Sequence, residues 1–546
     1  GSGEKVEPPA RFLQARMAPP VRPAWQYRVF VRIGMPDRGW ASVEKPFPSP
    51  SETETHELTV IFWEPTVSPD PQIQLLRLPP KGNSSEVRFA FPAAEGLQSI
   101  AARITVIHKN RVLQTGFLRA SLPALSWTFE LDATPRAHLE GLSARSRFDL
   151  ALVLNHDAEG IPRMTAVADD RAVVIPVGES AVEALTRALG DQISRIAAEP
   201  ARYETLQSEG SEELLRTLAQ HGGLLHQYLS GFEILERLEA ANGHQPRVHL
   251  TAARPDSFFP VELLYRFEVP EDTAKLCSHA LTALAQGACP SECPSEKSET
   301  VCPLGFWGMC RVIERHNHRR VEKRPQTGFD LRPEPVQPRS RLDISGKALV
   351  AASDAASLYD VGAVETLLER LRQRGPAEEV KSWKDWKARV AADHPKLLVL
   401  LPHHERKDGF EILQIGAADI LKFVKPEHVD PGSIVLLMGC ETNLAKIAFD
   451  SFVIQFILNG AAIVVSTIAT ILGRHASPAT ARLVELLDEE AHEEDSTFGE
   501  VMLRLRQKLV AEQTPMALGL TAYGDADWIL TKGADALDRD APRPLR

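Results

Sequence analysis

The strongest constraint on the fold is an alternation of strand-like and helix-like segments that begins at Lys347. Short, branched, apolar runs such as KLLVLLPH (396–403) and SIVLLMGC (433–440) are typical of buried strands. Amphipathic runs such as VETLLERLRQR (364–374) separate them. This alternation predicts a parallel-rich sheet covered by helices on both faces, so the expected fold class is α/β.

Two residues with catalytic potential end neighbouring strands of this predicted sheet. His403 ends the first run and Cys440 ends the second. The carboxyl ends of parallel strands share one edge of a sheet, and α/β folds bind their ligands there. A thiol next to an imidazole can form a thiolate nucleophile with its general base. The pair predicts a cysteine peptidase; a buried structural cysteine is the alternative interpretation of Cys440.

The residues next to Cys440 and His403 would influence the reactivity of the thiol and the choice of the base. Gly439 allows a sharp turn, and Glu441-Thr442-Asn443 provides capping residues for a following helix, whose amino terminus favours a thiolate. His404 directly follows His403 and is the alternative base. Successive residues of a strand point in opposite directions, so only one of the two imidazoles can face the crevice.

Composition bounds the remaining possibilities. The chain has 546 residues, 43% hydrophobic and 25% charged, which predicts a globular protein of several domains. A net charge of −11 without an extended basic block disfavours nucleic-acid binding. The longest apolar stretches are too short and too interrupted for a membrane span, so no membrane association is expected. Clustered cysteines, without a chain-wide disulfide pattern, indicate a reducing cytoplasm.

The chain divides into five expected regions. Residues 1–24 are Pro-rich and predict a linker or arm that opens with an expression remnant, and residues 25–140 contain the alternating short segments of a β-sandwich-like interaction domain. Residues 141–340 are mixed, with a small Cys-rich insertion at 277–310. Residues 341–535 form the predicted catalytic domain, and residues 536–546 a tail.

The Cys-rich insertion has the spacing of a metal site. A short knuckle, Cys289-Pro-Ser-Glu-Cys293, is flanked by two further cysteines, and together they predict a structural zinc site of Cys277, Cys289, Cys293 and Cys302. Cys310 is surplus because the periodic run FWGMCRVIERH (306–316) predicts a helix that packs it. His316 or His318 is an alternative ligand, and free thiols in a flexible insertion are the alternative to zinc.

Several ordered segments resemble one family. RFDLALVLNHD, FFPVELLYRF, CPLGFWGMCRVIERH, LLVLLPHHE, VLLMGCET and AYGDADW are similar, in this order, to motifs of the CHAT family of bacterial caspase-like peptidases, which are related to caspases and separase. The resemblance covers roughly residues 145–533. One departure is Val261, which replaces the tryptophan of the family's proline-Trp-Glu-Leu-Leu-Tyr element.

The resemblance implies roles for individual residues. Cys440 would be the nucleophile and His403 the base, and later the acid that protonates the leaving amine. Backbone N–H groups near Gly439 and His404 would form the oxyanion hole, although His404 stands where the family commonly has glycine. The wider clan often holds a basic P1 residue in an acidic pocket, for which the candidates are Glu405, Asp408, Asp525 and Asp527.

The resemblance also implies a biological role. The expected function is a cysteine endopeptidase that cleaves a protein partner in bacterial antiphage defence or regulated cell death. Such enzymes are normally latent and are switched on by a sensor domain or a partner protein. The alternative is a catalytically inactive caspase-like scaffold that serves as a protein-interaction module.

Overall fold

The computed structural model divides the chain into two compact units. Unit 1 comprises Gly1–Val177, His249–Ser257 and Asn317–Arg339, and unit 2 comprises Gly178–Val248, Phe258–His316 and Ser340–Arg546. The structure describes residues 10–21, 25–48, 54–122, 124–134, 146–157, 159–178, 180–203, 205–235, 245–252, 258–291, 293, 297–317, 329–330, 341–354, 362–407, 410–438, 448–468, 473–491, 496–512 and 515–532.

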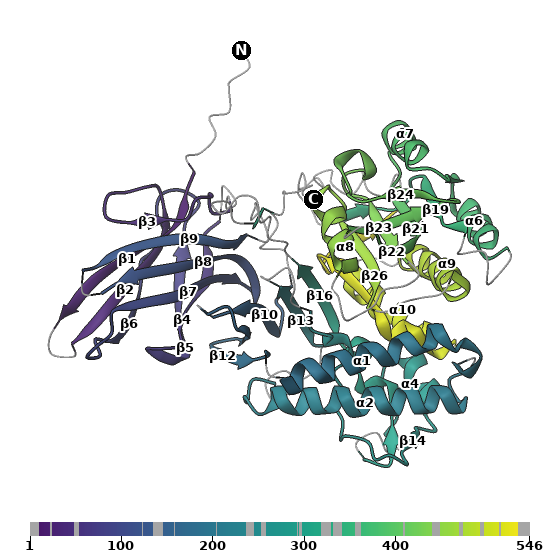
Figure 1. The fold of residues 1–546 in the computed structure, drawn as a ribbon, viewed down its shortest axis with the longest axis horizontal. Helices are drawn as coiled ribbons and strands as arrows, with labels where there is room; N and C mark the ends of the chain where they lie inside the picture. The colour runs from purple at the N-terminus through teal and green to yellow at the C-terminus, as the bar shows by residue number, and fades with distance from the viewer. Residues whose placement is uncertain are drawn as a thin grey trace, which may run out of the picture. The chain divides into compact units, whose positions relative to one another are not determined.

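Unit 1 contains a β-sandwich, as the sequence predicts (Figure 1). One sheet has the order β3 (Ala41–Ser42), β1 (Phe12–Val21), β2 (Gln26–Gly34) and β6 (Val87–Pro92). The other has the order β17 (Phe329–Asp330), β9 (Ser126–Thr134), β8 (Arg111–Ser121), β7 (Ser99–His108), β4 (His56–Glu64) and β5 (Ser68–Leu78). Phe62 of β4 stacks on Phe89 of β6 with ring centroids 5.3 Å apart, so the two sheets share one apolar core.

A second, smaller core in unit 1 joins this sandwich to a three-stranded antiparallel segment. That segment consists of β10 (Leu150–His156), β11 (Pro162–Ala168) and β12 (Arg171–Pro176). Ala151, Val153 and Val167 pack with Ile61 and Ile107 of the sandwich. β13 (Arg247–Ala252) crosses the division between the two units.

Unit 2 is built on a mixed sheet whose parallel part confirms the α/β prediction. Its strands follow the order β16 (Val312–Asn317), β27 (Leu520–Gly524), β26 (Ile463–Thr467), β25 (Ile434–Leu437), β21 (Leu397–Leu401), β19 (Ala348–Ala352) and β20 (Ala377–Glu379). The strands from β26 to β20 are parallel, and β27 is antiparallel to β26. β19, β21, β25 and β26 are buried along their whole length, which explains their unbroken apolar sequences.

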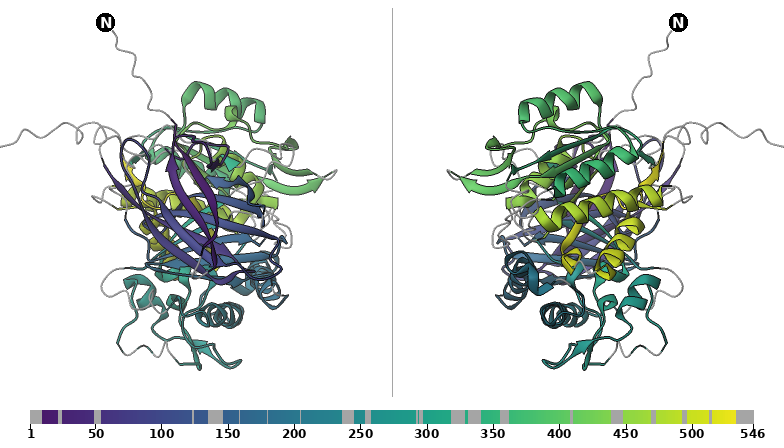
Figure 2. Two further views of the ribbon diagram at one scale, coloured as in Figure 1. Left: turned by 90° about the vertical axis from the view of Figure 1, so that its left-hand side faces the viewer. Right: turned by 90° about the vertical axis from the view of Figure 1, so that its right-hand side faces the viewer.

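Helices cover this sheet on both faces (Figure 2). α7 (Trp383–Asp393) and α8 (Ala448–Leu458) bury Trp386, Phe452 and Phe456 against alternate residues of β19, β21 and β25. α6 (Ala363–Arg374) packs against α9 (Gly473–Glu490), which also contacts α10 (Phe498–Ala511). Among the described residues, no helix combines the length and the apolar character needed to cross a bilayer.

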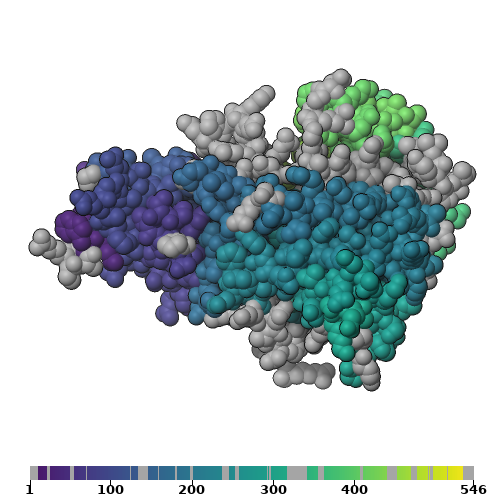
Figure 3. All heavy atoms as spheres, turned by 60° about the horizontal axis from the view of Figure 1, so that its bottom comes forward, coloured from purple at the N-terminus to yellow at the C-terminus, as the bar shows by residue number. Residues whose placement is uncertain are grey.

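The first part of unit 2 consists mainly of two long helices and the Cys-rich segment. α1 (Ser180–Ala198) and α2 (Glu209–Ser230) lie side by side, and this region gives the teal surface in Figure 3. Shorter elements follow: η2 (Val261–Leu263), β14 (Lys275–Leu276), α4 (Ala280–Gln286), β15 (Thr300–Val301), η3 (Pro303–Gly305) and α5 (Trp307–Cys310).

The predicted helix over 306–316 is wrong beyond its first turn. α5 ends at Cys310, and the chain continues as strand β16 from Val312. Arg315 of β16 pairs with Gly524 of β27. Strand pairing across the fold therefore overrides the local helical periodicity.

Candidate active site

The strands that precede the predicted dyad are adjacent, parallel and in register. Leu397 of β21 pairs with Ile434 of β25, and Leu400 pairs with Leu437. The backbone N–H of Met438 donates to the carbonyl oxygen of Leu400 at 2.9 Å, which extends the ladder past the last paired residues. Gly439, Cys440 and Asp408 lie outside the described residues.

His403 does not end its segment; it begins a second strand. β22 (His403–Lys407) pairs antiparallel with β23 (Phe410–Ile415), which pairs with β24 (Asp419–Leu421). The β22–β23 hairpin extends away from the body of unit 2 (Figure 2). The two histidines therefore occupy the first two positions of a strand at the carboxyl edge of the main sheet.

The environments of the two imidazoles differ. The His404 side chain is 5% exposed; its Nε2 lies 3.2 Å from the Glu411 carboxylate, and its ring meets Phe452 edge-on at 6.0 Å. The His403 side chain is 27% exposed, and its Nε2 lies 3.8 Å from Glu405 Oε2. His403 is the accessible imidazole and His404 is part of the packed interior.

The three described acidic candidates for a P1 pocket, Glu405, Asp525 and Asp527, do not lie together. Glu405 is half-buried and lies next to His403. Asp525 and Asp527 follow β27, whose last residue, Gly524, pairs with Ile463 at the start of β26. Because β27 runs opposite to the parallel strands, these two aspartates lie at the edge of the sheet away from His403.

Both aspartates also have partners of their own. Asp527 forms a buried ion pair with Arg247 at 2.5 Å. Asp525 lies 3.7 Å from Nε2 of His316, which also lies 3.2 Å from Glu314. Of the three acidic candidates that the structure describes, Glu405 alone lies close to His403.

The Cys-rich segment brings its cysteines together. The sulfur atoms of Cys289, Cys293 and Cys302 lie within 4.8 Å of one another, a spacing that suits one metal ion. Cys277 Sγ lies 3.2 Å from Cys293 Sγ, and Cys289 Sγ lies 3.6 Å from Cys302 Sγ. The backbone N–H of His279 donates to Cys277 Sγ at 3.4 Å.

Short elements position these cysteines. β14 and β15 pair in parallel, and Cys277 N–H donates to the Val301 carbonyl, so Cys277 and Cys302 follow neighbouring strands. The Tyr265 hydroxyl accepts a hydrogen bond from the backbone N–H of Cys302 at 3.1 Å. Burial raises the pKa of Tyr265, and the phenol therefore stays neutral.

The thiols influence one another. The Cys289 sulfur, as hydrogen-bond partner, and burial together raise the pKa of the Cys302 thiol. Burial raises the pKa of Cys310, which is not among the clustered sulfur atoms. Of the alternative ligands, His316 contacts Glu314 instead, and His318 lies outside the described residues.

A buried ion pair in unit 2 is a feature that sequence reasoning missed. Arg315 of β16 meets Glu262 of η2 at 2.5 Å, and both side chains are almost fully buried. Arg506 of α10 is buried nearby, and burial lowers its pKa to about 10. The available signal was Glu262, the one charged residue within the apolar run FFPVELLY (258–265).

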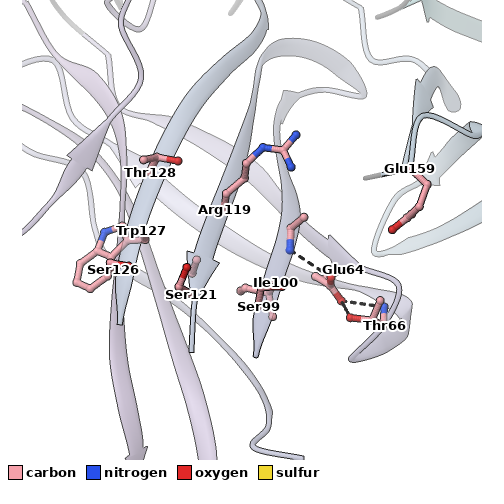
Figure 4. A pocket seen from close by; sticks show the side chains of 12 residues that line it. Glu64, Thr66, Ser99, Ile100, Arg119, Ser121, Ser126, Trp127, Thr128 and Glu159 are labelled. Carbon is pink, nitrogen blue, oxygen red and sulfur yellow. Dashed lines mark hydrogen bonds between the residues drawn. The ribbon is translucent and has the colours of Figure 1, made fainter. Parts of the chain in front are cut away.

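A separate cavity in unit 1 has none of the predicted chemistry. It has a volume of about 510 Å³ and opens at the ends of β4, β7, β8 and β9 (Figure 4). Arg119, Trp127 and Glu159 line it, and the Glu64 carboxylate there accepts hydrogen bonds from Thr66. No thiol or imidazole is among its lining residues, so it is not the predicted peptidase site.

The chain is similar to two solved structures of other proteins. It is similar to separase in the Saccharomyces cerevisiae separase–securin complex, with a TM-score of 0.37 and 10% identity over 69% of this chain and 30% of that chain. It is also similar to the Arg-specific cysteine proteinase gingipain R (RgpB), with a TM-score of 0.31 and 11% identity over 62% of this chain and 74% of that chain.

The comparisons leave the family open. The chain spans about 30% of the length of the separase chain that it matches. No family model and no curated protein matches the sequence.

Proposed function

We propose that the chain is a cysteine endopeptidase of the caspase-like CHAT type, with Cys440 as nucleophile and His403 as general base. The register of β21 and β25 carries the proposal. Leu400 pairs with Leu437, His403 follows Leu400 by three residues, and Cys440 follows Leu437 by three residues. Because the two residues follow paired positions of adjacent parallel strands by the same number of residues, we expect the imidazole and the thiol to lie close together at the edge of the sheet. Peptide-library cleavage by the wild type and by Cys440→Ala tests it.

The exposure of the two histidines supports His403 as the base. A base must reach the nucleophile and then give its proton to the leaving amine, which requires access to the substrate. His403 has this access, whereas His404 is enclosed by Phe452 and Glu411. The backbone N–H groups near Gly439 and at His404 are the proposed oxyanion donors, a feature worth about 3–4 kcal/mol in other acyl transfer enzymes.

Replacing each histidine separately distinguishes the two candidate bases. We expect His403→Ala to lower kcat/KM by about 10³-fold, because it removes the proton acceptor. We expect His404→Ala to lower it less than about tenfold while reducing thermal stability, because it leaves a cavity beside Phe452. Steady-state cleavage and thermal unfolding of both variants give the comparison. The reverse order of activity losses would make His404 the base.

We infer that the four clustered cysteines bind a structural zinc ion. Cys277, Cys289, Cys293 and Cys302 supply four sulfur ligands, the set that closes a tetrahedral site and leaves no position for water. The ion would stabilise the Cys-rich segment, which has only short helices and strands. It would also keep the backbone N–H of Cys302 in place to donate to the Tyr265 hydroxyl. Its role would therefore be to stabilise unit 2 rather than to activate water.

Metal analysis tests the zinc proposal. We expect about one zinc ion per purified chain, and a chelator should lower the thermal stability of unit 2 because the metal-binding free energy adds to the folding free energy. Cys302→Ser should lose the zinc, and Cys310→Ser is the matched control that should keep it. Zinc contents that fall equally in the two variants, or a wild type without zinc, would contradict the assignment.

The biological setting is proposed from the CHAT resemblance. We place the enzyme in bacterial antiphage defence or regulated cell death, where it would cleave a protein partner after activation by a sensor domain or a second protein. The β-sandwich of unit 1 is the proposed site of that coupling, because an interaction module next to a peptidase can report binding to it. A sandwich-deleted chain that needs the same activator as the full chain would contradict this assignment.

A further inference from the structure

The small sheet that begins at His403 has one packed face and a second, partly exposed face, here called the outer face. His404, Leu413 and Leu421 occupy paired positions across β22, β23 and β24, and all three are buried. Directly paired residues point to the same side of a sheet, and successive residues point to opposite sides. His403, Gln414 and Ile420 are likewise paired across the three strands, so they share the outer face.

Exposed apolar side chains concentrate on this sheet and directly after its last strand. Among the described residues from 341 onward, the exposed large hydrophobic residues are Phe410 at 45%, Ile420 at 36% and Phe423 at 51%. Phe410 and Phe423 contact each other edge-on at 6.1 Å, and Lys422 Nζ lies 4.7 Å from the centre of the Phe410 ring. Apolar side chains gathered in this way on an otherwise polar surface indicate a binding role.

The chemistry of peptide cleavage indicates which part of a substrate would meet this face. The imidazole that removes the thiol proton later protonates the nitrogen of the leaving amine, so it lies on the leaving-group side of the cleaved bond. Ile420 lies two strand spacings from His403, which is about 10 Å. An extended polypeptide covers that distance in about three residues.

We propose that the outer face of β22–β24 binds the substrate segment that follows the cleaved bond, and that Ile420 selects an apolar residue there. The inference rests on the proposed function, because it takes His403 as the catalytic base. The second to fourth residues after the cleaved bond would reach Ile420. Ile412 lies on the same face but is fully buried, so Phe410 and Phe423 form a separate apolar contact farther along the hairpin.

Two substrate types with the same acyl half test this assignment. One is a peptide library in which the four residues after the cleaved bond vary, and the other is an aryl amide that lacks them. We expect Ile420→Lys to lower the ratio of kcat/KM for the best library peptide over the aryl amide about tenfold, because an apolar contact is lost. Ile420→Lys should also shift the preferred residue after the cleaved bond from apolar to acidic. The separate variant Ile420→Val should keep the apolar preference of the wild type.

Leu281→Lys is the matched control, since Leu281 is similarly exposed at 39% but lies on α4. Its ratio and its sequence preference should equal those of the wild type. If Ile420→Lys changes neither the kcat/KM ratio nor the sequence preference, the inference is wrong. It is also wrong if Ile420→Lys changes only the oligomeric state, because the outer face would then bind a second copy of the chain. Failure of the proposed function is distinguishable, because it appears as equal cleavage by the wild type and Cys440→Ala.

Discussion

Cys440→Ala is expected to abolish peptide cleavage, with a loss of at least about 10⁴-fold in kcat. The thiolate is the atom that attacks the scissile carbonyl, so alanine removes the covalent route while leaving strands β21 and β25 in place. Residual hydrolysis would come from binding and oxyanion stabilisation alone. The measurement is mass-spectrometric detection of cleaved peptides from a library, with candidate activators present for both proteins.

The matched control for this variant is Cys310→Ala. Cys310 is a free cysteine that ends α5, and it belongs to neither proposed site. It should retain wild-type cleavage, which would show that losing a thiol is not itself inactivating. Equal cleavage by wild type and Cys440→Ala would remove the nucleophile assignment and favour the catalytically inactive scaffold.

The sequence predicted the two strands that precede the candidate site, because they depend on local pattern. Unbroken apolar runs identify β21 and β25 as buried parallel strands, and their lengths predict that His403 and Cys440 follow them at the same edge. The cysteine cluster was also predictable, because Cys289 and Cys293 are four residues apart. The pairing of β14 with β15 was not, since two-residue strands leave no periodic signal.

Features set by pairing between distant segments could not be predicted in this way. The direction of β27 places Asp525 and Asp527 at the opposite sheet edge from His403, and no local pattern encodes that direction. The strand β22 was missed because HHERK has no apolar alternation, although the Asp-Gly pair that follows it is a known hairpin signal. The pairing of β22 with β23 places His403 and His404 on opposite faces of the small sheet, and this difference distinguishes the two candidate bases.

Glu262→Ala is expected to destabilise unit 2 by about 3–5 kcal/mol, because it leaves a buried guanidinium without its carboxylate. Arg315 donates to both carboxylate oxygens of Glu262, at 3.3 and 2.5 Å, and to the Phe259 carbonyl at 3.1 Å. The Glu262 charge also favours the charged form of Arg506, which is already disfavoured by burial. Removing Glu262 therefore takes away a carboxylate that stabilises both buried cations.

Hydrogen exchange at increasing urea concentrations measures the free energy of unfolding of unit 2 separately from that of the sandwich, because peptides from β16 and α10 belong to unit 2. Glu86→Ala is the control, since the Arg16–Glu86 ion pair at 3.0 Å is exposed and its loss should cost less than about 1 kcal/mol. In the double variant Glu262→Leu/Arg315→Met, an apolar pair replaces the charges, and most of the lost stability should return. A Glu262→Ala protein as stable as the Glu86→Ala protein would mean that Arg315 reaches water, and that the PVELLY segment does not anchor β16 through this pair.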